Sequence, residues 1–261
     1  MIRPRLIPCL LMHNGGLVKT CQFKDPVYLG DPLNAVKIFN EKKADELIFL
    51  DIDASVNNEE PNYNLIKKLA SECRMPICYG GGISKPDQAQ RIVDMGVEKI
   101  AMSSSVIANP SLVEAAAKSV GSQSVVVILD IFKKENFFGT SYQVKTHNAK
   151  VAVNAEPFDL IKRFQDLGAG EIVINSINND GVMKGYDLDF IAKAKSLVNI
   201  PFTFLGGAGS YDHFMELFNH VGLVGAAAGS FFVFKGKYRA VLISYPNADT
   251  KKSLFPNINY T

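Results

Sequence analysis

The sequence lacks the features that would direct it to metal ions, membranes or nucleic acids. No apolar stretch approaches the roughly 18 to 20 residues needed to cross a bilayer, and the first residues lack the long apolar core of a signal peptide. The net charge is only +2, with no basic stripe and no acidic tail. The four cysteines do not show the paired spacing in the sequence that is typical of metal sites; they are Cys9, Cys21, Cys73 and Cys78. We therefore expect a reduced, soluble, cytoplasmic protein with no metal, no cofactor, no nucleic-acid partner and no membrane segment.

Eight short apolar runs are present, and segments with apolar residues at a helical period separate them. Nearly continuous apolar strands that alternate with helices indicate a parallel sheet covered on its outer face. With 261 residues, of which 47% are hydrophobic, eight such units fit one (β/α)8 barrel, or TIM barrel, as a single domain over residues 1–261. The expected strands are Leu6–Leu11, Leu47–Leu50, Pro76–Tyr79, Lys99–Met102, Val125–Leu129, Ile172–Ile174, Pro201–Leu205 and Leu223–Ala227.

The sequence also repeats itself at an offset of about half its length. The segment Glu46-Leu47-Ile48 recurs as Glu171-Ile172-Val173, and the run from Pro76 to Gly82 recurs as the run from Pro201 to Gly207. A constant offset through three strands is difficult to attribute to chance. We therefore predict a barrel built from two half-barrels.

Each half has a glycine-rich strand end followed, one unit later, by a small hydroxyl-bearing turn before a helix. Glycine lets backbone amides approach an anion, and a helix N-terminus adds partial positive charge. Two sites on opposite sides of the barrel mouth would hold a long ligand with a phosphate at each end. The other interpretation is that the glycines only permit tight turns. The candidate phosphate contacts are Gly81, Gly82 and Ser104 in the first half, and Gly206, Gly207, Gly229 and Ser230 in the second.

An acid follows the fifth strand, at the end of the barrel where chemistry on this fold takes place. Asp130 is therefore a candidate general acid or base, although a solvated or loop-capping aspartate is the plainer alternative. The corresponding position after the first strand holds Leu11, which cannot carry charge or move protons. A mechanism that needs two acids facing each other across the ligand is therefore in doubt.

Two loops at this end of the barrel carry polar candidates. The loop after the sixth strand offers Asn175, Asp180 and Gly181, residue types that suit ligand binding but also make ordinary turns. The long first loop, residues 12–31, contains Lys19 and is interpreted either as a lid over the mouth or as a disordered surface loop.

Four charged residues mark the opposite end, at the starts of four strands. Two are positive and two negative, so they could form one salt-bridged ring that closes the bottom of the barrel. Such a ring usually serves stability on this fold. Its members are Arg5, Glu46, Lys99 and Glu171.

Several longer motifs follow one another along the chain. They include Arg5-Leu6-Ile7-Pro8-Cys9-Leu10, Gly80-Gly81-Gly82-Ile83, Asp180-Gly181 and Gly206-Gly207-Ala208-Gly209. Together these motifs resemble the cyclase subunit of imidazole glycerol phosphate synthase, in the same order from about residue 3 to residue 235. That family is a (β/α)8 barrel that receives ammonia from a separate glutaminase subunit docked at its bottom. At its top it splits and cyclises a long bisphosphate, releasing imidazole glycerol phosphate and an aminoimidazole carboxamide ribotide.

The resemblance assigns roles to single residues. It makes Asp130 the second catalytic aspartate, Lys19 part of the closing loop, and Asp51 and Asp180 pocket residues. It turns the charged bottom ring into a gate over an ammonia channel, and it implies a phosphate-bearing small-molecule ligand. The same glycines and serines become its phosphate contacts: Gly82, Ser104, Gly206, Gly207 and Ser230.

The sequence departs from the family at the site of chemistry. Leu11 replaces the first catalytic aspartate, and Asn175 and Asn178 replace a pocket threonine and an aspartate. A sequence that keeps the gate residues but changes the catalytic residues resembles a divergent branch of this family. That branch works beside a glutaminase and a sugar amidotransferase, and it supplies ammonia for the conversion of acetamido to acetamidino groups on the sugars of surface glycans. The remaining hypotheses are a true histidine-pathway cyclase and a scaffold without catalysis.

Overall fold

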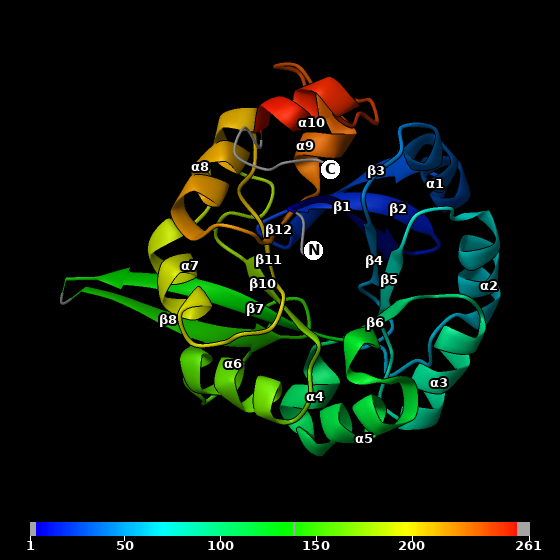
Figure 1. Cartoon of the computed structure of the whole chain (residues 1–261), viewed down its shortest axis with the longest axis vertical. Helices are drawn as coiled ribbons and strands as arrows, with labels where there is room; N and C mark the ends of the chain where they lie inside the picture. Colours follow the sequence, from blue (N-terminus) through cyan, green and yellow to red (C-terminus); the bar gives the residue numbers. More distant parts are fainter. Residues whose placement is uncertain (1–3, 138, 255–261) are drawn as a thin grey trace.

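The structure, a computed structural model, describes residues 4–137 and 139–254, so the ends of the expected 1–261 domain lie outside the described residues. Eight strands pair in parallel around a closed ring, because β7 and β10 also pair with each other. The (β/α)8 barrel is therefore confirmed (Figure 1). Its strands are β1 (Arg5–His13), β4 (Leu47–Asp51), β5 (Ile77–Gly80), β6 (Lys99–Met102), β7 (Val125–Asn136), β10 (Glu171–Ser176), β11 (Phe202–Leu205) and β12 (Gly225–Ala228).

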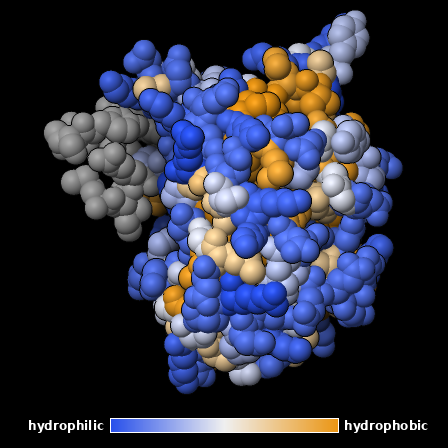
Figure 2. All heavy atoms as spheres, turned by 90° about the vertical axis from the view of Figure 1, so that its right-hand side faces the viewer, coloured by the Kyte–Doolittle hydropathy of each residue, from blue (hydrophilic) through white to orange (hydrophobic). Residues whose placement is uncertain are grey.

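Helices surround this ring on its outside (Figure 1). Each long helix turns an apolar face to the strands, and several begin at a capping residue: the Asp31 side chain, for example, accepts a hydrogen bond from the Asn34 amide at the start of α1. The outward faces leave a largely hydrophilic surface over α1, α2 and α3, with apolar residues in small groups (Figure 2). The long helices are α1 (Pro32–Glu41), α2 (Tyr63–Glu72), α3 (Pro86–Asp94), α5 (Ser111–Val120), α6 (Pro157–Asp166), α7 (Leu188–Lys195) and α8 (Tyr211–Val221).

Short elements complete the described chain. The single-turn helices α4 (Ser104–Ala108) and α9 (Ser230–Val233) follow β6 and β12 at the barrel mouth. A 3-10 turn over Ser122–Ser124, the pair β13 (Phe234–Lys235) and β14 (Ala240–Val241), and α10 (Ala248–Leu254) are the others outside the two hairpins described below.

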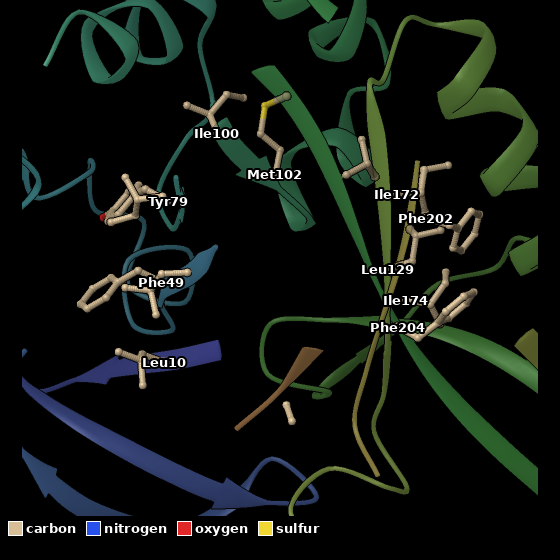
Figure 3. Close-up of a cluster of buried hydrophobic side chains, with 14 of the residues drawn as sticks. Leu10, Phe49, Tyr79, Ile100, Met102, Leu129, Ile172, Ile174, Phe202 and Phe204 are labelled. Atoms are coloured by element: carbon tan, nitrogen blue, oxygen red, sulfur yellow. The ribbon is translucent and has the colours of Figure 1, made fainter. Parts of the chain in front are cut away.

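Two separate apolar layers hold the barrel together. The outer layer fills the space between strands and helices, and Figure 3 shows part of it, including Leu10, Phe49 and Phe202. The inner layer fills the barrel itself, with Ile7 and Cys9 among its members. Side chains on a strand alternate between its two faces, so β1 supplies Ile7 and Cys9 inward and Leu10 outward.

Two hairpins extend the barrel strands at the mouth, and the strand pattern did not predict them. The first loop forms the antiparallel strands β2 (Gly16–Cys21) and β3 (Lys24–Gly30), with β2 paired to β1. The interpretation of residues 12–31 as a disordered loop is therefore wrong. β7 continues past the barrel and pairs with β8 (Gly139–Thr146), which pairs with the short β9 (Val151–Ala152); this hairpin projects away from the ring (Figure 1).

The two halves of the barrel match in register as well as in sequence. Leu11 on β1 lies beside Leu50 on β4, and Asp130 on β7 lies beside Asn175 on β10. Leu50 and Asn175 stand at the offset of the internal repeat. Leu11 therefore occupies, in the first half, the place that Asp130 has in the second.

Candidate functional site

The predicted charged residues meet in one ring at the bottom of the barrel. Arg5 Nη1 donates to Glu46 at 2.5 Å and Arg5 Nη2 donates to Glu171 at 2.7 Å. Lys99 Nζ lies 2.8 Å from both Glu46 and Glu171, so cations and carboxylates alternate. The Thr203 hydroxyl donates to Glu171 at 2.6 Å. The expected ion-pair network is therefore present.

The ring holds its residues charged despite their burial. Burial disfavours the charged form of Glu171, but Arg5 and Lys99 outweigh it and lower the pKa of this carboxyl. Burial also opposes charge on Lys99, and the two glutamates outweigh it and raise the pKa of Lys99. The bottom is closed by cations and carboxylates that pair with one another, so each buried carboxylate has a partner of opposite charge.

Above the ring, the barrel interior is apolar and uncharged. The inner layer contains Ile48, Val126 and Val173, with the thiols of Cys78 and Cys9. Burial raises the pKa of Cys9 to about 12, and burial likewise raises the pKa of Cys78, with Glu46 of the ring adding to the effect. Both thiols are therefore neutral near pH 7, and the inner-layer side chains named here carry no charge that would hold a small molecule.

A cavity opens at the other end, where the barrel strands finish. Its empty volume is about 1050 Å³, including its open mouth, which is the size and place expected of a ligand site on this fold. Most of the predicted pocket residues line it: Leu11, Lys19, Asp51, Asp130, Asn175 and Asp180. Gly181 lies behind this wall, where an added Cβ would meet the Thr20 carbonyl at 2.5 Å.

Asp130 is the titratable group at the floor of this cavity. Burial raises the pKa of Asp130 to about 7. The hydrogen bond from Asn175 lowers this pKa, and the nearby Asp180 raises it, but both effects are smaller than that of burial. Asn175 Nδ2 donates to Asp130 Oδ1 at 2.9 Å. A carboxyl with a pKa near neutrality is suited to take up and release a proton.

The opposite wall of the floor is apolar. Leu11 and Leu50 stand where the second half has Asp130 and Asn175, and both leucines line the cavity. The two halves thus present a leucine pair and an acid–amide pair to the same space. Neither leucine can transfer a proton, so a carboxyl is missing at the position that matches Asp130. The acid that lines the cavity on this side is Asp51, the residue after Leu50.

The β2–β3 hairpin is held at the mouth by a buried ion pair. Lys19 Nζ donates to Asp180 Oδ1 at 2.5 Å, and the Thr20 hydroxyl donates to Asp180 Oδ2 at 2.8 Å. The Lys19 stem also packs over Gly229, where an added Cβ would lie 2.7 Å from Lys19 Cε. Lys19 and Asp180, which lie 161 residues apart in the sequence, therefore join the first loop to the loop after β10.

The two groups of phosphate candidates differ in their access to the cavity. Gly81, Gly82 and Ser104 line it, and so does Gly229. Gly206 and Gly207 are buried, and an added Cβ at Gly207 would clash with the Gly185 carbonyl. Ser230 is buried as well and accepts a hydrogen bond from Arg239 at 3.2 Å. The first-half group faces the cavity more openly than the second.

Sequence patterns missed two cavity residues on the turn after β8. His147 and Asn148 line the mouth, and with Ala149 they have positive φ angles of 53°, 55° and 63°. Asn148 Nδ2 donates to the Ile52 carbonyl at 2.9 Å, so this turn reaches across to the loop after β4. Finding them required the β7–β8 hairpin, which the barrel strand pattern does not indicate.

Asn178, another residue expected in the pocket, instead connects a loop to a strand through hydrogen bonds to the backbone. Asn178 donates to the Lys133 carbonyl at 3.0 Å and accepts from the Lys133 amide at 2.7 Å, so it ties the loop after β10 to β7.

In residues 4–137 and 139–254, no cluster of three or more histidine, cysteine, aspartate or glutamate side chains has the arrangement of a metal site. None of the helices in the same residues is both long and apolar enough to cross a membrane.

Comparison with known proteins identifies the family. The family model "Histidine biosynthesis protein" matches residues 5–239. A Leptospira borgpetersenii protein provisionally named imidazole glycerol phosphate synthase subunit HisF is 55% identical over 98% of this chain and 100% of its own length. A Vibrio vulnificus protein, provisionally named as the subunit hisF3 of this synthase, is 56% identical over 97% of this chain and 96% of its own. The imidazole glycerol phosphate synthase subunit HisF of Campylobacter lari is 38% identical over 89% and 91%. The chain therefore belongs to the histidine biosynthesis protein family, as a divergent relative of imidazole glycerol phosphate synthase subunit HisF.

Proposed function

We propose that the protein is the ammonia-accepting barrel subunit of a glutamine amidotransferase system, acting in the cytoplasm as one domain over residues 1–261. A separate glutaminase subunit binds at the bottom of the barrel, and the ammonia it releases passes through the barrel interior to the upper cavity. With a sugar amidotransferase as third component, this ammonia converts an acetamido group to an acetamidino group in surface-glycan biosynthesis.

The series of environments along the barrel axis carries this proposal. The charged ring lies at the bottom, the uncharged interior with Cys78 and Cys9 lies above it, and Asp130 lies where the interior opens into the cavity. Ammonia is small and neutral, so an interior without charges allows it to pass. Charged solutes and protons meet the ring first, which gives Arg5, Glu46, Lys99 and Glu171 the role of a gate.

The leucine pair favours a supply role over cyclisation. A cyclase must protonate one group and deprotonate another, and one carboxyl cannot be in both states at the same time. The position across the floor that matches Asp130 holds Leu11, beside Leu50, and neither leucine is an acid. The barrel therefore delivers ammonia with little or no cyclase activity of its own.

A true cyclase of histidine biosynthesis is the second candidate, and the candidate phosphate-binding residues of the first half-barrel favour it. Gly81, Gly82 and Ser104 line the cavity, and Lys19 reaches the same space from the β2–β3 hairpin. Backbone amides and a lysine are suited to bind a phosphate-bearing ligand. A sugar nucleotide or sugar phosphate would use the same groups, so the phosphate contacts are compatible with both candidates.

The proposal is tested by comparing two nitrogen sources in a reconstituted system. The barrel is combined with a glutaminase and a sugar amidotransferase of the same organism, and acetamidino product is measured with glutamine or with ammonium. The variant Lys99→Glu should lower the glutamine-dependent rate at least tenfold and leave the ammonium-dependent rate nearly unchanged. The retained ammonium reaction also shows that the variant is folded.

The exposed Lys118 provides a matched control. Within residues 4–137 and 139–254 its ion-pair partner is Glu114, on the surface of α5. Lys118→Glu therefore makes the same charge change away from the ring and should alter neither rate. Equal loss with both nitrogen sources in Lys99→Glu would refute gating and leave the ring a role in stability alone.

A further inference from the structure

The Asp130–Asn175 pair marks the point where the apolar interior meets the polar cavity. Both residues project into the barrel from adjacent strands in direct register, and their side chains are hydrogen-bonded at 2.9 Å. Below them lie Ile128 and Val173 of the inner layer. The equivalent place in the other half is filled by Leu11 and Leu50, so the polarity is confined to one wall.

One atom of this pair has no hydrogen-bond partner within the described chain. Asn175 is only 7% exposed, and its Oδ1 is fully buried and unpaired among residues 4–137 and 139–254. An unsatisfied buried carbonyl is destabilising, so most such atoms in folded proteins accept a hydrogen bond. The amide cannot satisfy itself by turning over, because Oδ1 would then face the carboxylate of ionised Asp130.

The chemistry of these atoms defines the kind of ligand that would bind them. Asn175 Nδ2 already donates to Asp130, which leaves Asn175 Oδ1 and the carboxylate as acceptors. A matching ligand must donate several hydrogen bonds and must not be an anion. Ammonium has four donors, one positive charge and the size of a water molecule.

We propose that Asp130 and Asn175 form a binding site for ammonium, with the Asp130 carboxylate and Asn175 Oδ1 accepting its hydrogen bonds. This inference rests on the proposed function, which brings ammonia through the interior to this point. Asn175 is then a binding residue that an apolar side chain would not replace. Asp130 either pairs with the positive charge of ammonium or accepts the proton that ammonium gives up on becoming ammonia.

The test is carried out on the isolated full-length protein labelled with ¹³C at the aspartate carboxyl carbons. Ammonium chloride is titrated while the Asp130 resonance, identified by its loss in Asp130→Asn, is followed by NMR. Tetramethylammonium chloride serves as the control, because it has the same charge and no hydrogen to donate. We expect a saturable shift with ammonium and none with tetramethylammonium.

Two variants assign the site. Asn175→Leu, close in size and without an acceptor, should weaken ammonium binding at least tenfold. Asn199→Leu makes the same substitution at an exposed position that does not line the cavity and should leave binding unchanged. Identical responses to the two salts in the unaltered protein would overturn the site. Because no glutaminase is present, this result is separate from the nitrogen-source experiment, and either proposal can fail without the other.

Discussion

Replacing Asp130 with asparagine is expected to stabilise the fold at alkaline pH. Burial raises the pKa of Asp130 from 3.8 to about 7, so the folded protein keeps a proton that the unfolded chain has already lost. Between these two values the folded state binds more protons, and stability therefore falls as the pH rises. Below about pH 4 both states are protonated and the penalty vanishes, whereas above about pH 7 it is complete.

The size of the effect follows from the pKa difference. Each unit corresponds to about 1.4 kcal/mol, so a rise of about 3 units gives a penalty of about 4 kcal/mol above pH 7, as an upper bound. The amide introduced by Asp130→Asn does not titrate but still accepts the hydrogen bond from Asn175. The advantage of this variant over the unaltered protein should therefore grow by up to about 3 kcal/mol between pH 5 and pH 8.

Urea unfolding of both proteins at pH 5 and pH 8 measures this difference directly. Other titrating groups affect both proteins alike, so only the change in their difference matters. The stabilised variant should at the same time lose ammonium binding, as expected where a destabilised group serves function. If the difference between the unfolding free energies of the two proteins were the same at pH 5 and pH 8, Asp130 would not be buried as a neutral acid.

Two further substitutions test the charged ring and the candidate phosphate-binding residues of the first half-barrel. Glu171→Gln leaves Arg5 and Lys99 short of a buried partner, so urea unfolding should show a loss of about 3 to 5 kcal/mol; a loss below about 1 kcal/mol would mean that water replaces the carboxylate. Gly82→Ala places a Cβ 2.6 Å from the Glu59 carbonyl at a φ of +73°, so inorganic phosphate binding, followed by ³¹P NMR, should weaken at least tenfold. Gly96→Ala, at a φ of +98° with its nearest contact at 3.8 Å, is the matched control and should keep phosphate binding.

The sequence was sufficient to predict the barrel because its strands and helices have distinct periods. Lys99–Met102 was predicted at its observed bounds, and the expected strand Leu47–Leu50 differs from β4 by a single residue. Strand starts were less accurate at Pro76 and Pro201, since proline has no amide hydrogen to pair and both strands begin one residue later.

The hairpins and the condition of the site were beyond what the sequence could predict. The expected strand Val125–Leu129 continues to Asn136 because β8 pairs with its extension, and this pairing depends on contacts between distant residues. The Lys19–Asp180 ion pair spans 161 residues for the same reason. Asp130 was predicted from its place after a strand, but its raised pKa depends on burial that only the folded cavity provides.

The central claim, that the barrel supplies ammonia without cyclising, is tested most directly with the bisphosphate substrate of imidazole glycerol phosphate synthase. The purified protein is incubated with this substrate and ammonium at alkaline pH, and imidazole glycerol phosphate is measured. With Leu11 opposite Asp130, we expect turnover lower than that of a histidine-pathway cyclase by a factor on the order of 10² or more. Leu11→Asp should restore part of the activity. Robust turnover by the unaltered protein would contradict the account and establish the histidine-pathway cyclase in its place.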